Sequence, residues 1–162
     1  MKGENQVNPV YPHVQTSADL LNSTVRLESL IPLLLEQKAT AVAITNRRMY
    51  GTVPFYQSMK KAGIHPVIGL SCDIEFSDTI KLPIQVYAKT LKGYRNLLKI
   101  SSALEVKGLM QLPLNWLHAY KEDCYIILSM PNTDDWLDSE IGEILSEMKK
   151  LFLTELYAGI ER

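Results

Sequence analysis

The sequence predicts an α/β fold in which apolar strands alternate with amphipathic helices. Short runs of consecutive apolar residues, of which 41–44 is the clearest, are typical of strands buried on both faces. Segments such as 92–107 instead carry apolar residues at the spacing of a helix buried on one side. Glycine, proline and other turn-forming residues stand between these runs. The alternation indicates a largely parallel sheet, either open and doubly wound or curled into a barrel.

The first third of the chain is predicted to hold a polar leader, a strand and a helix. Residues 1–9 lack an apolar core, and a strand is expected over 10–16. The loop 19–24 ends in residues that favour capping a following helix. A helix is expected through Leu27 to Leu35, and Pro32 leaves two alternatives. Either the helix begins near Ser29, where proline falls in the first turn and its missing N–H costs nothing, or the helix kinks at Pro32.

The middle of the chain continues the alternation. We expect strands at 41–44, 66–76 and 83–88, a helix at 53–62 and a turn at 77–79. The helix 92–107 is predicted to turn its inner face to the core through Tyr94, Leu97, Leu98 and Leu104.

The last third is predicted to hold a short helix, two strands and a longer helix between them. The short helix is 116–120, and the strands are 125–128 and 156–160. Asn132 or Thr133 is expected to cap the longer helix, with acidic residues at its start and Lys149 and Lys150 at its end, as the helix dipole favours. About six strands are expected, and since the last residues follow a strand closely, we expect a barrel incomplete at its C-terminus.

Composition places the chain among ordinary globular proteins of about one domain. Apolar residues make up 46% of its 162 residues, and the formal net charge is −1, so no global field draws it to nucleic acid or membrane. Cys72 and Cys124 stand in apolar runs and are expected to be buried, reduced thiols. No secretory signal and no apolar run of about 20 residues is present, which favours a cytoplasmic protein without a membrane partner.

The chain offers few residues for catalysis. It lacks glycine-rich phosphate loops and a G-x-S-x-G elbow, and Cys72 is better explained as core than as a nucleophile. Of three histidines only His13 stands near the C-terminal end of a strand, and one imidazole cannot hold a dinuclear metal site. A hydrogen-bonded structural role is therefore favoured for His13. The clusters at 60–61 and along 92–99 are expected to be solvated faces.

The loop after the strand 41–44 lies where α/β proteins place their chemistry. It carries Asn46, Arg47 and Arg48, where a hydrolytic metal site would need carboxylates and imidazoles. Arg47 and Arg48 could instead contact a phosphate or an acidic segment of a neighbouring domain.

These segments resemble the PHP (polymerase and histidinol phosphatase) domain of bacterial DNA polymerase III alpha subunits, in particular the shorter Gram-positive alpha-type replicase. The resemblance covers about residues 10–120, and Trp116-Leu117 adds a weaker block. Four blocks carry it: Asp19-Leu20-Leu21-Asn22-Ser23; Ala43-Ile44-Thr45 with Met49-Tyr50-Gly51 and Phe55-Tyr56; Gly63-Ile64-His65-Pro66-Val67-Ile68-Gly69-Leu70; and Ala88-Lys89 with Gly93-Tyr94-Arg95-Asn96-Leu97-Leu98-Lys99-Ile100-Ser101-Ser102.

The resemblance implies a PHP-type distorted (β/α)7 TIM-like barrel whose active members hold a metal cluster at the C-terminal mouth and hydrolyse phosphoesters. Residues 10–162 would be the N-terminal part of such a domain, after the flexible leader 1–9. Carried over position by position, the family's metal ligands fall on Tyr11, His13, Gln15, Asn46, Arg47, Ser71 and Pro83. Among these only His13 keeps the ligand type. One residue is deleted before Met49.

The resemblance with these departures implies a degenerate, non-catalytic PHP domain that supports the core of a replicative DNA polymerase. The parent protein would be a DNA-directed DNA polymerase, a nucleotidyltransferase, with its other domains, replisome proteins and DNA as partners. No cofactor is expected in this segment. The alternative is a metal-dependent phosphoesterase or 3′–5′ exonuclease that uses zinc or manganese on His13 and carboxylates such as Asp19, Asp73 or Glu75. A freestanding interaction module is a third possibility.

Overall fold

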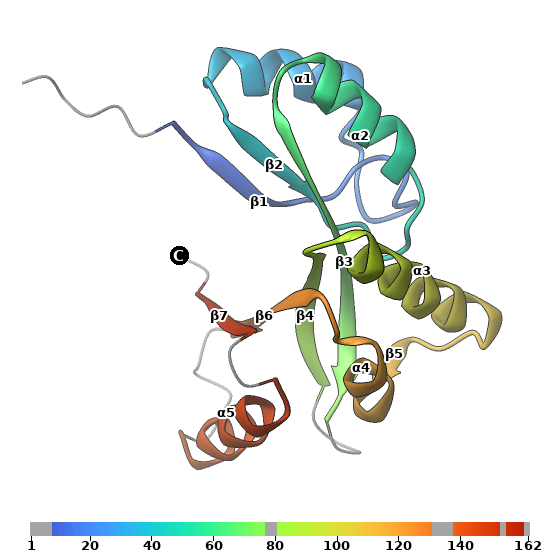
Figure 1. The fold of residues 1–162 in the computed structure, drawn as a ribbon, viewed down its shortest axis with the longest axis vertical. Helices are drawn as coiled ribbons and strands as arrows, with labels where there is room; N and C mark the ends of the chain where they lie inside the picture. Colours follow the sequence, from blue (N-terminus) through green and yellow to red (C-terminus); the bar gives the residue numbers. More distant parts are fainter. Residues whose placement is uncertain (1–7, 77–80, 131–137, 153–154, 161–162) are drawn as a thin grey trace, which may run out of the picture. The chain divides into compact units, whose positions relative to one another are not determined.

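The computed structural model describes residues 8–76, 81–130, 138–152 and 155–160 (Figure 1). Packing divides the chain into two compact units. The first comprises the residues up to Asn46 together with Tyr50–Ile68, and the second comprises Arg47–Met49 and the residues from Gly69 onward. The elements follow the order β1 (Val10–Val14), α1 (Leu27–Glu36), β2 (Ala41–Ile44), α2 (Thr52–Lys61), β3 (His65–Glu75), β4 (Lys81–Ala88), α3 (Leu91–Val106), β5 (Gln111–Pro113), α4 (Leu114–Tyr120), β6 (Cys124–Met130), α5 (Asp138–Phe152) and β7 (Leu156–Ile160).

The first unit is a parallel three-stranded sheet with two helices. β1 pairs with β2, and β2 pairs with the first residues of β3, so that Ala41 lies between Val10 and His65. The connections between these strands contain α1 and α2, as crossovers between parallel strands require. Both helices lie on the same side of the strands (Figure 1). The core between helices and strands is made by Leu30, Leu34, Val42, Ile44, Phe55, Met59 and Ile64.

The second unit is a mixed sheet with helices beside it. The later part of β3 runs antiparallel to β4, β4 runs antiparallel to β6, and β6 runs parallel to β7, while β5 joins β3 in parallel. α3 packs against β4 and lies beside α4 (Figure 1). Fully buried residues of this unit include Leu70, Ile74, Leu82, Ile84, Leu97, Ile100, Leu104 and Leu112.

The predicted largely parallel sheet needs correction at β4, which is antiparallel to both of its neighbours. Only residues 76–80 separate β3 from β4. A parallel connection needs a crossover of about a dozen residues or more, so this short link forces an antiparallel pair.

Most element positions match the sequence prediction, and the exceptions have local causes. β2 and β7 have the predicted bounds. α1 begins at Leu27 rather than near Ser29, so Pro32 lies inside the helix, and Arg26 occupies the N-cap without a side-chain hydrogen bond. The expected capping by the loop 19–24 is therefore wrong.

The inner face of α3 also differs from the prediction. Leu97 and Leu104 are buried, but Leu98 is 37% exposed and Tyr94 is half-buried. The buried positions instead include Asn96 and Ile100. The short strand β5 was not predicted. The expected turn at 77–79, the cap at 132–133 and most of the leader lie outside the described residues.

Both cysteines are free and buried, as predicted. Within the described ranges, no helix combines the length and apolar character needed to cross a membrane.

Candidate functional site

The predicted site residues of the first unit begin with His13 on β1. Its Nδ1 atom lies 2.7 Å from Oγ1 of Thr45, the first residue after β2. Thr45 Oγ1 also lies 3.4 Å from the backbone oxygen of Val14, as a weaker donor contact. Thr45 is buried and His13 is exposed. The imidazole is thus held through one ring nitrogen by a hydroxyl group of the neighbouring strand end.

The Asn46 side chain uses both its amide oxygen and its amide nitrogen in hydrogen bonds within this unit. It is 2% exposed, and its Oδ1 accepts a hydrogen bond of 2.8 Å from the backbone N–H of Thr16. Its Nδ2 donates to Oγ1 of Thr16 and to the backbone oxygen of Tyr50, both at 3.0 Å. The amide therefore joins the segment after β1, the end of β2 and the approach to α2.

Gly51 follows Tyr50 directly, and its backbone conformation helps to orient the Tyr50 carbonyl that accepts from Asn46. Its φ of +75° lies in the left-handed region, which residues with a Cβ atom rarely adopt. A Cβ at this position would stand 2.6 Å from Cβ of Ala18. The glycine is therefore required both by its dihedral angle and by the close approach of the chain after β1.

Arg47 and Arg48 belong to the second unit, where both form ion pairs. Nη2 of Arg47 lies 3.6 Å from a carboxylate oxygen of Asp73 on β3. Nε of Arg48 donates to a carboxylate oxygen of Glu105 on α3 at 2.8 Å. The next backbone N–H, that of Met49, donates to Oγ of Ser101 at 3.1 Å. The three-residue segment is thus attached to β3 and α3.

Ser71 and Pro83 lie on adjacent strands of the same unit. Ser71 stands opposite Gln85, and Pro83 stands opposite Asp73, in the antiparallel register of β3 and β4. Because side chains alternate along a strand, Ser71, Asp73 and their partners share one sheet face. Oγ of Ser129 on β6 donates to Oε1 of Gln85 at 3.0 Å. Around Ser71 this face therefore carries the neutral polar groups of Gln85 and Ser129, and the Asp73 carboxylate that follows is paired with Arg47.

The carboxylates proposed for the alternative metal site have other surroundings. Asp19 is buried in the loop after β1, where its Oδ1 accepts from Nδ2 of Asn22. Asp73 is paired with Arg47, and Glu75 is exposed near the end of β3. In the part of the chain that the structure describes, no three His, Cys, Asp or Glu side chains gather closely enough to hold a metal ion.

Cys72 lies between Ser71 and Asp73 but points to the core. Burial, with a smaller contribution from the negative charge of Asp73, raises the pKa of its thiol to about 12. A thiol with this pKa is almost wholly protonated at neutral pH, and the thiolate is the reactive form. Cys72 therefore fits the predicted core role.

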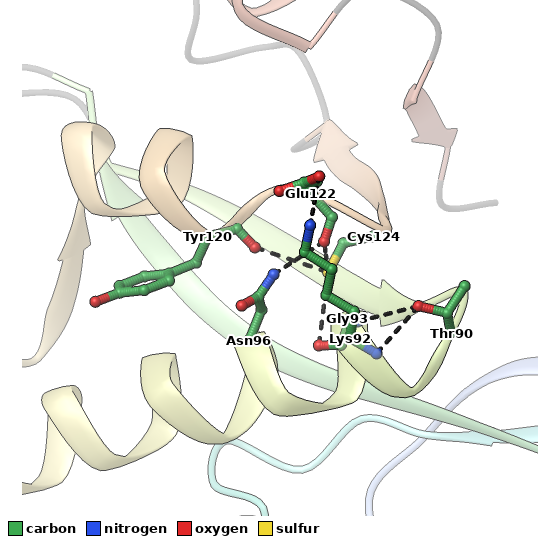
Figure 2. A network of polar contacts seen from close by, with 7 residues as sticks. All are labelled: Thr90, Lys92, Gly93, Asn96, Tyr120, Glu122 and Cys124. Atoms are coloured by element: carbon green, nitrogen blue, oxygen red, sulfur yellow. Dashed lines mark hydrogen bonds and ion pairs between the residues drawn. The ribbon is translucent and has the colours of Figure 1, made fainter.

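A second polar network lies at the start of α3 (Figure 2). The Thr90 side chain caps the helix by accepting from the N–H groups of Lys92 and Gly93. Nδ2 of Asn96 donates to the backbone oxygen of Glu122 at 3.0 Å, and the Lys92 ammonium lies 2.5 Å from the Glu122 carboxylate. These contacts attach the helix to the turn before β6 and give Asn96, a polar residue of the block that begins at Gly93, a structural role.

The predicted positions therefore fall into two groups. In the first unit, His13 and Asn46 are held by Thr45 and Thr16. In the second, Arg47 contacts Asp73, which faces Pro83 across the strand pair. Sequence reasoning missed Thr16, Tyr50, Ser101 and Glu105 as partners. For Thr16 a signal was present, since it is a hydroxyl residue directly after a strand; the other three have no sequence signal.

Comparison with known proteins identifies the family. The PHP domain family matches residues 12–161. The DNA polymerase III subunit alpha of Bacillus subtilis is 36% identical over 134 residues, which is 80% of this chain and 12% of that protein. The DNA polymerase III subunit alpha of Halalkalibacterium halodurans is 33% identical over 122 residues, 74% of this chain and 11% of that protein. The chain thus spans about one eighth to one ninth of the length of these relatives.

Two solved structures share the fold at low sequence identity. An amidohydrolase from Chromobacterium violaceum has a TM-score of 0.63 and 9% identity, with 95% of this chain and 76% of that chain covered. A protein of Bifidobacterium adolescentis assigned as a metal-dependent phosphoesterase has a TM-score of 0.53 and 10% identity, with 85% of this chain and 74% of that chain covered. These neighbours confirm the predicted fold class, an α/β fold of the PHP-type barrel kind.

Proposed function

Since this chain belongs to the PHP domain family, we propose that it is a non-catalytic PHP domain that supports the polymerase core of a replicative DNA polymerase III alpha subunit. The parent protein would be a DNA-directed DNA polymerase in the cytoplasm, with its other domains, replisome proteins and DNA as partners. Identity of 33–36% to two DNA polymerase III alpha subunits supports this parentage.

The observation that carries the non-catalytic role is the bonding of Asn46. Its amide oxygen and both amide protons are used within the protein. A divalent ion prefers carboxylate oxygen and imidazole nitrogen, and it would have to compete with the Thr16 N–H for the single amide oxygen. The side chain at this position is therefore already occupied as a cross-link between backbone segments.

The charge of Arg47 supports the same conclusion. A guanidinium group is protonated at all accessible pH values and has no lone pair for a metal ion. It repels a divalent cation placed nearby, and here it pairs with Asp73, a carboxylate that the alternative metal site would need. Together with Ser71 and Pro83, which supply no anionic ligand, this donor set does not fit a cluster of divalent ions.

The two arginines were predicted as a contact for an anion or for another domain. Each now has a carboxylate partner within the second unit, Asp73 for Arg47 and Glu105 for Arg48. Arg47 keeps 45% of its side chain exposed, so a further acidic group of the polymerase core could share the guanidinium with Asp73. We propose this as the interdomain contact.

The alternative function is a metal-dependent phosphoesterase or exonuclease. One neighbour in fold is assigned as a metal-dependent phosphoesterase. His13 is exposed near the end of β1, where it could serve as a ligand. Against this, the three carboxylates proposed to complete the site lie in three different settings. Asp19 is buried in the loop after β1, Asp73 is paired with Arg47, and Glu75 is exposed at the end of β3.

Metal content and phosphodiester cleavage test the proposal. We expect the purified chain, dialysed against zinc and then manganese, to retain far less than one equivalent by plasma mass spectrometry. We also expect no cleavage of a 3′-labelled oligonucleotide above the level of an Arg47→Ala variant. Stoichiometric metal together with turnover would overturn the non-catalytic role.

Deletion of this domain from a longer native protein tests the supporting role. If the reading frame continues into a polymerase, removal of residues 8–160 should lower the solubility and thermal stability of the remainder. A remainder of unchanged stability and polymerase activity would contradict support of the core.

A further inference from the structure

A row of cations and aromatic rings runs along α3 and α4 in the second unit. We name it the basic–aromatic ridge and define it by six residues: Lys92, Arg95, Lys99 and Lys107 from the helix α3 and its C-cap, and Trp116 and Tyr120 from α4. We propose that this ridge binds single-stranded nucleic acid, with the cations contacting phosphates and the aromatic rings stacking on bases.

The spacing places the cations on one side of the helix. Lys92, Arg95 and Lys99 are separated by three and four residues, which brings them to the same face, and Lys107 extends the row by two further turns. From Arg95 to Lys107 the helix rises about 18 Å, which is long enough to follow several nucleotides of a single strand.

The aromatic rings of α4 lie under these cations. Nζ of Lys99 is 5.6 Å from the ring centre of Tyr120, and Nζ of Lys107 is 4.2 Å from that of Trp116. Both rings are half-buried. Figure 2 shows the Tyr120 side chain pointing away from the polar network at the start of α3. Each ring therefore has a cation beside it and part of its surface accessible to solvent.

The charge of the ridge is local and positive. Residues 91–107 contain four basic side chains and one acidic side chain, Glu105, in a chain whose net charge is −1. Glu105 is paired with Arg48, and Lys92 is paired with Glu122 at 2.5 Å. Arg95 and Lys99 thus carry positive charge on α3 between these two ion pairs, and Lys107 adds a further positive charge just after Glu105.

The combination of cations and aromatic rings favours single strands over other polyanions. Cations alone attract the phosphates of any nucleic acid. Exposed aromatic rings add binding free energy by stacking on unpaired bases, and a duplex has no unpaired bases to stack on them. An acidic protein segment would use the cations without needing the rings. The ridge therefore fits a ligand that carries regular negative charge and flat apolar groups together.

Fluorescence anisotropy with a labelled 15-residue oligothymidylate tests the proposal. At 25 mM NaCl we expect saturable binding by the whole 162-residue chain. The variant Arg95→Ala/Lys99→Ala/Lys107→Ala should bind at least about tenfold more weakly, and the slope of log affinity against log salt should fall by about 2, since each phosphate contact contributes about 0.7.

A second variant separates stacking from charge. Trp116→Leu/Tyr120→Leu keeps apolar contacts under α3 but removes the rings, so we expect roughly tenfold weaker binding with an unchanged salt slope. The matched control is Lys38→Ala/Lys60→Ala/Lys61→Ala in the first unit, which removes three exposed charges elsewhere and should leave affinity nearly unchanged. Circular dichroism verifies that every variant is folded.

Four results would overturn the proposal. They are no binding of the oligonucleotide by the unaltered chain, an equal loss in the control variant, binding of a blunt duplex as tight as that of the single strand, or equally tight binding of a polyglutamate peptide of the same charge. The last two would point to an electrostatic surface without base stacking.

Discussion

Asn46 and Thr16 exchange hydrogen bonds in both directions. The Thr16 N–H donates to Oδ1 of Asn46 at 2.8 Å, and Nδ2 of Asn46 donates to Oγ1 of Thr16 at 3.0 Å. The same Nδ2 group donates to the backbone oxygen of Tyr50. Only a side chain that both donates and accepts can make this set, so a carboxylate at this position could not replace the amide without loss.

We therefore predict that Asn46→Asp destabilises the chain. The carboxylate would lose both donated hydrogen bonds, face the Tyr50 carbonyl and bury a charge, which should cost about 3 kcal/mol. Urea denaturation followed by circular dichroism measures the change. Asn115→Asp, at an exposed position near the start of α4, is the matched control and should be close to neutral. Equal stability of the two variants would show that the Asn46 network contributes little.

The ion pair between Arg47 and Asp73 should contribute only modestly to stability. The two side chains are 45% and 29% exposed and the closest distance is 3.6 Å, so water and salt screen the pair. A double-mutant cycle with Arg47→Ala and Asp73→Asn should give a coupling free energy of about 0.3–1 kcal/mol. The coupling should disappear in 1 M NaCl, where the Debye length is about 3 Å. A coupling that persists at this salt concentration, or none at low salt, would contradict the assigned pairing.

The sequence predicted strands and helices well where the local signal was strong. Ala41–Ile44 is a run of four apolar residues and became β2 without adjustment. Strand direction has no such signal, because an apolar run looks the same in either orientation, and β4 was therefore misplaced in a parallel sheet. β5 has three residues and ends in Pro113, too few to show a period. For α1 the sequence left two starts open, and the structure has the earlier one, at Leu27. The capping residue was not predictable, because Arg26 adopts the extended N-cap conformation without the capping side chain that a sequence signal relies on.

The candidate site was predictable in residue type but not in partners. The loop residues Asn46 and Arg47 stand out because a strand end in this fold usually carries ligands. Their partners follow only from tertiary structure: Thr16 lies 30 residues from Asn46, and Glu105 lies 57 residues from Arg48. Contacts over such separations depend on how the strands and helices pack in three dimensions. A single sequence does not show which distant residues this packing brings into contact.

The close packing at Gly93 predicts a strongly unfavourable substitution. A Cβ at this position would lie 2.1 Å from the backbone oxygen of Asp123, and a backbone atom cannot move away as a flexible side chain can. Gly93→Ala should therefore destabilise by about 3 kcal/mol. Gly142→Ala in α5 is the control, since among the described residues outside the backbone of that helix turn no atom lies within 4 Å of the added methyl group, and alanine favours a helix by roughly 0.5–1 kcal/mol. Thermal unfolding should shift in opposite directions for the two variants, and a shift in the same direction would contradict the assigned packing.

The buried thiols predict a loss of stability at alkaline pH. Burial raises the pKa of Cys72 from 9.0 to about 12 and that of Cys124 to about 11. Above pH 9 the unfolded chain therefore loses these protons before the folded chain does, so the unfolded state binds fewer protons and stability falls as pH rises from about 9 toward 12. Urea denaturation at pH 8 and pH 10.5 should show this decrease.

A variant and a labelling experiment assign that decrease to the thiols. Cys72→Ala/Cys124→Ala should have a smaller pH dependence between the same two values, although burial also raises the pKa of Tyr87 to about 12 and leaves part of the effect in place. Because the thiolate is the reactive form, a disulfide reagent should modify both cysteines slowly at pH 8 and rapidly after addition of urea. Rapid modification of either cysteine in the folded chain at pH 8 would contradict burial, and an unchanged pH dependence in the double variant would assign the alkaline transition to groups other than the thiols.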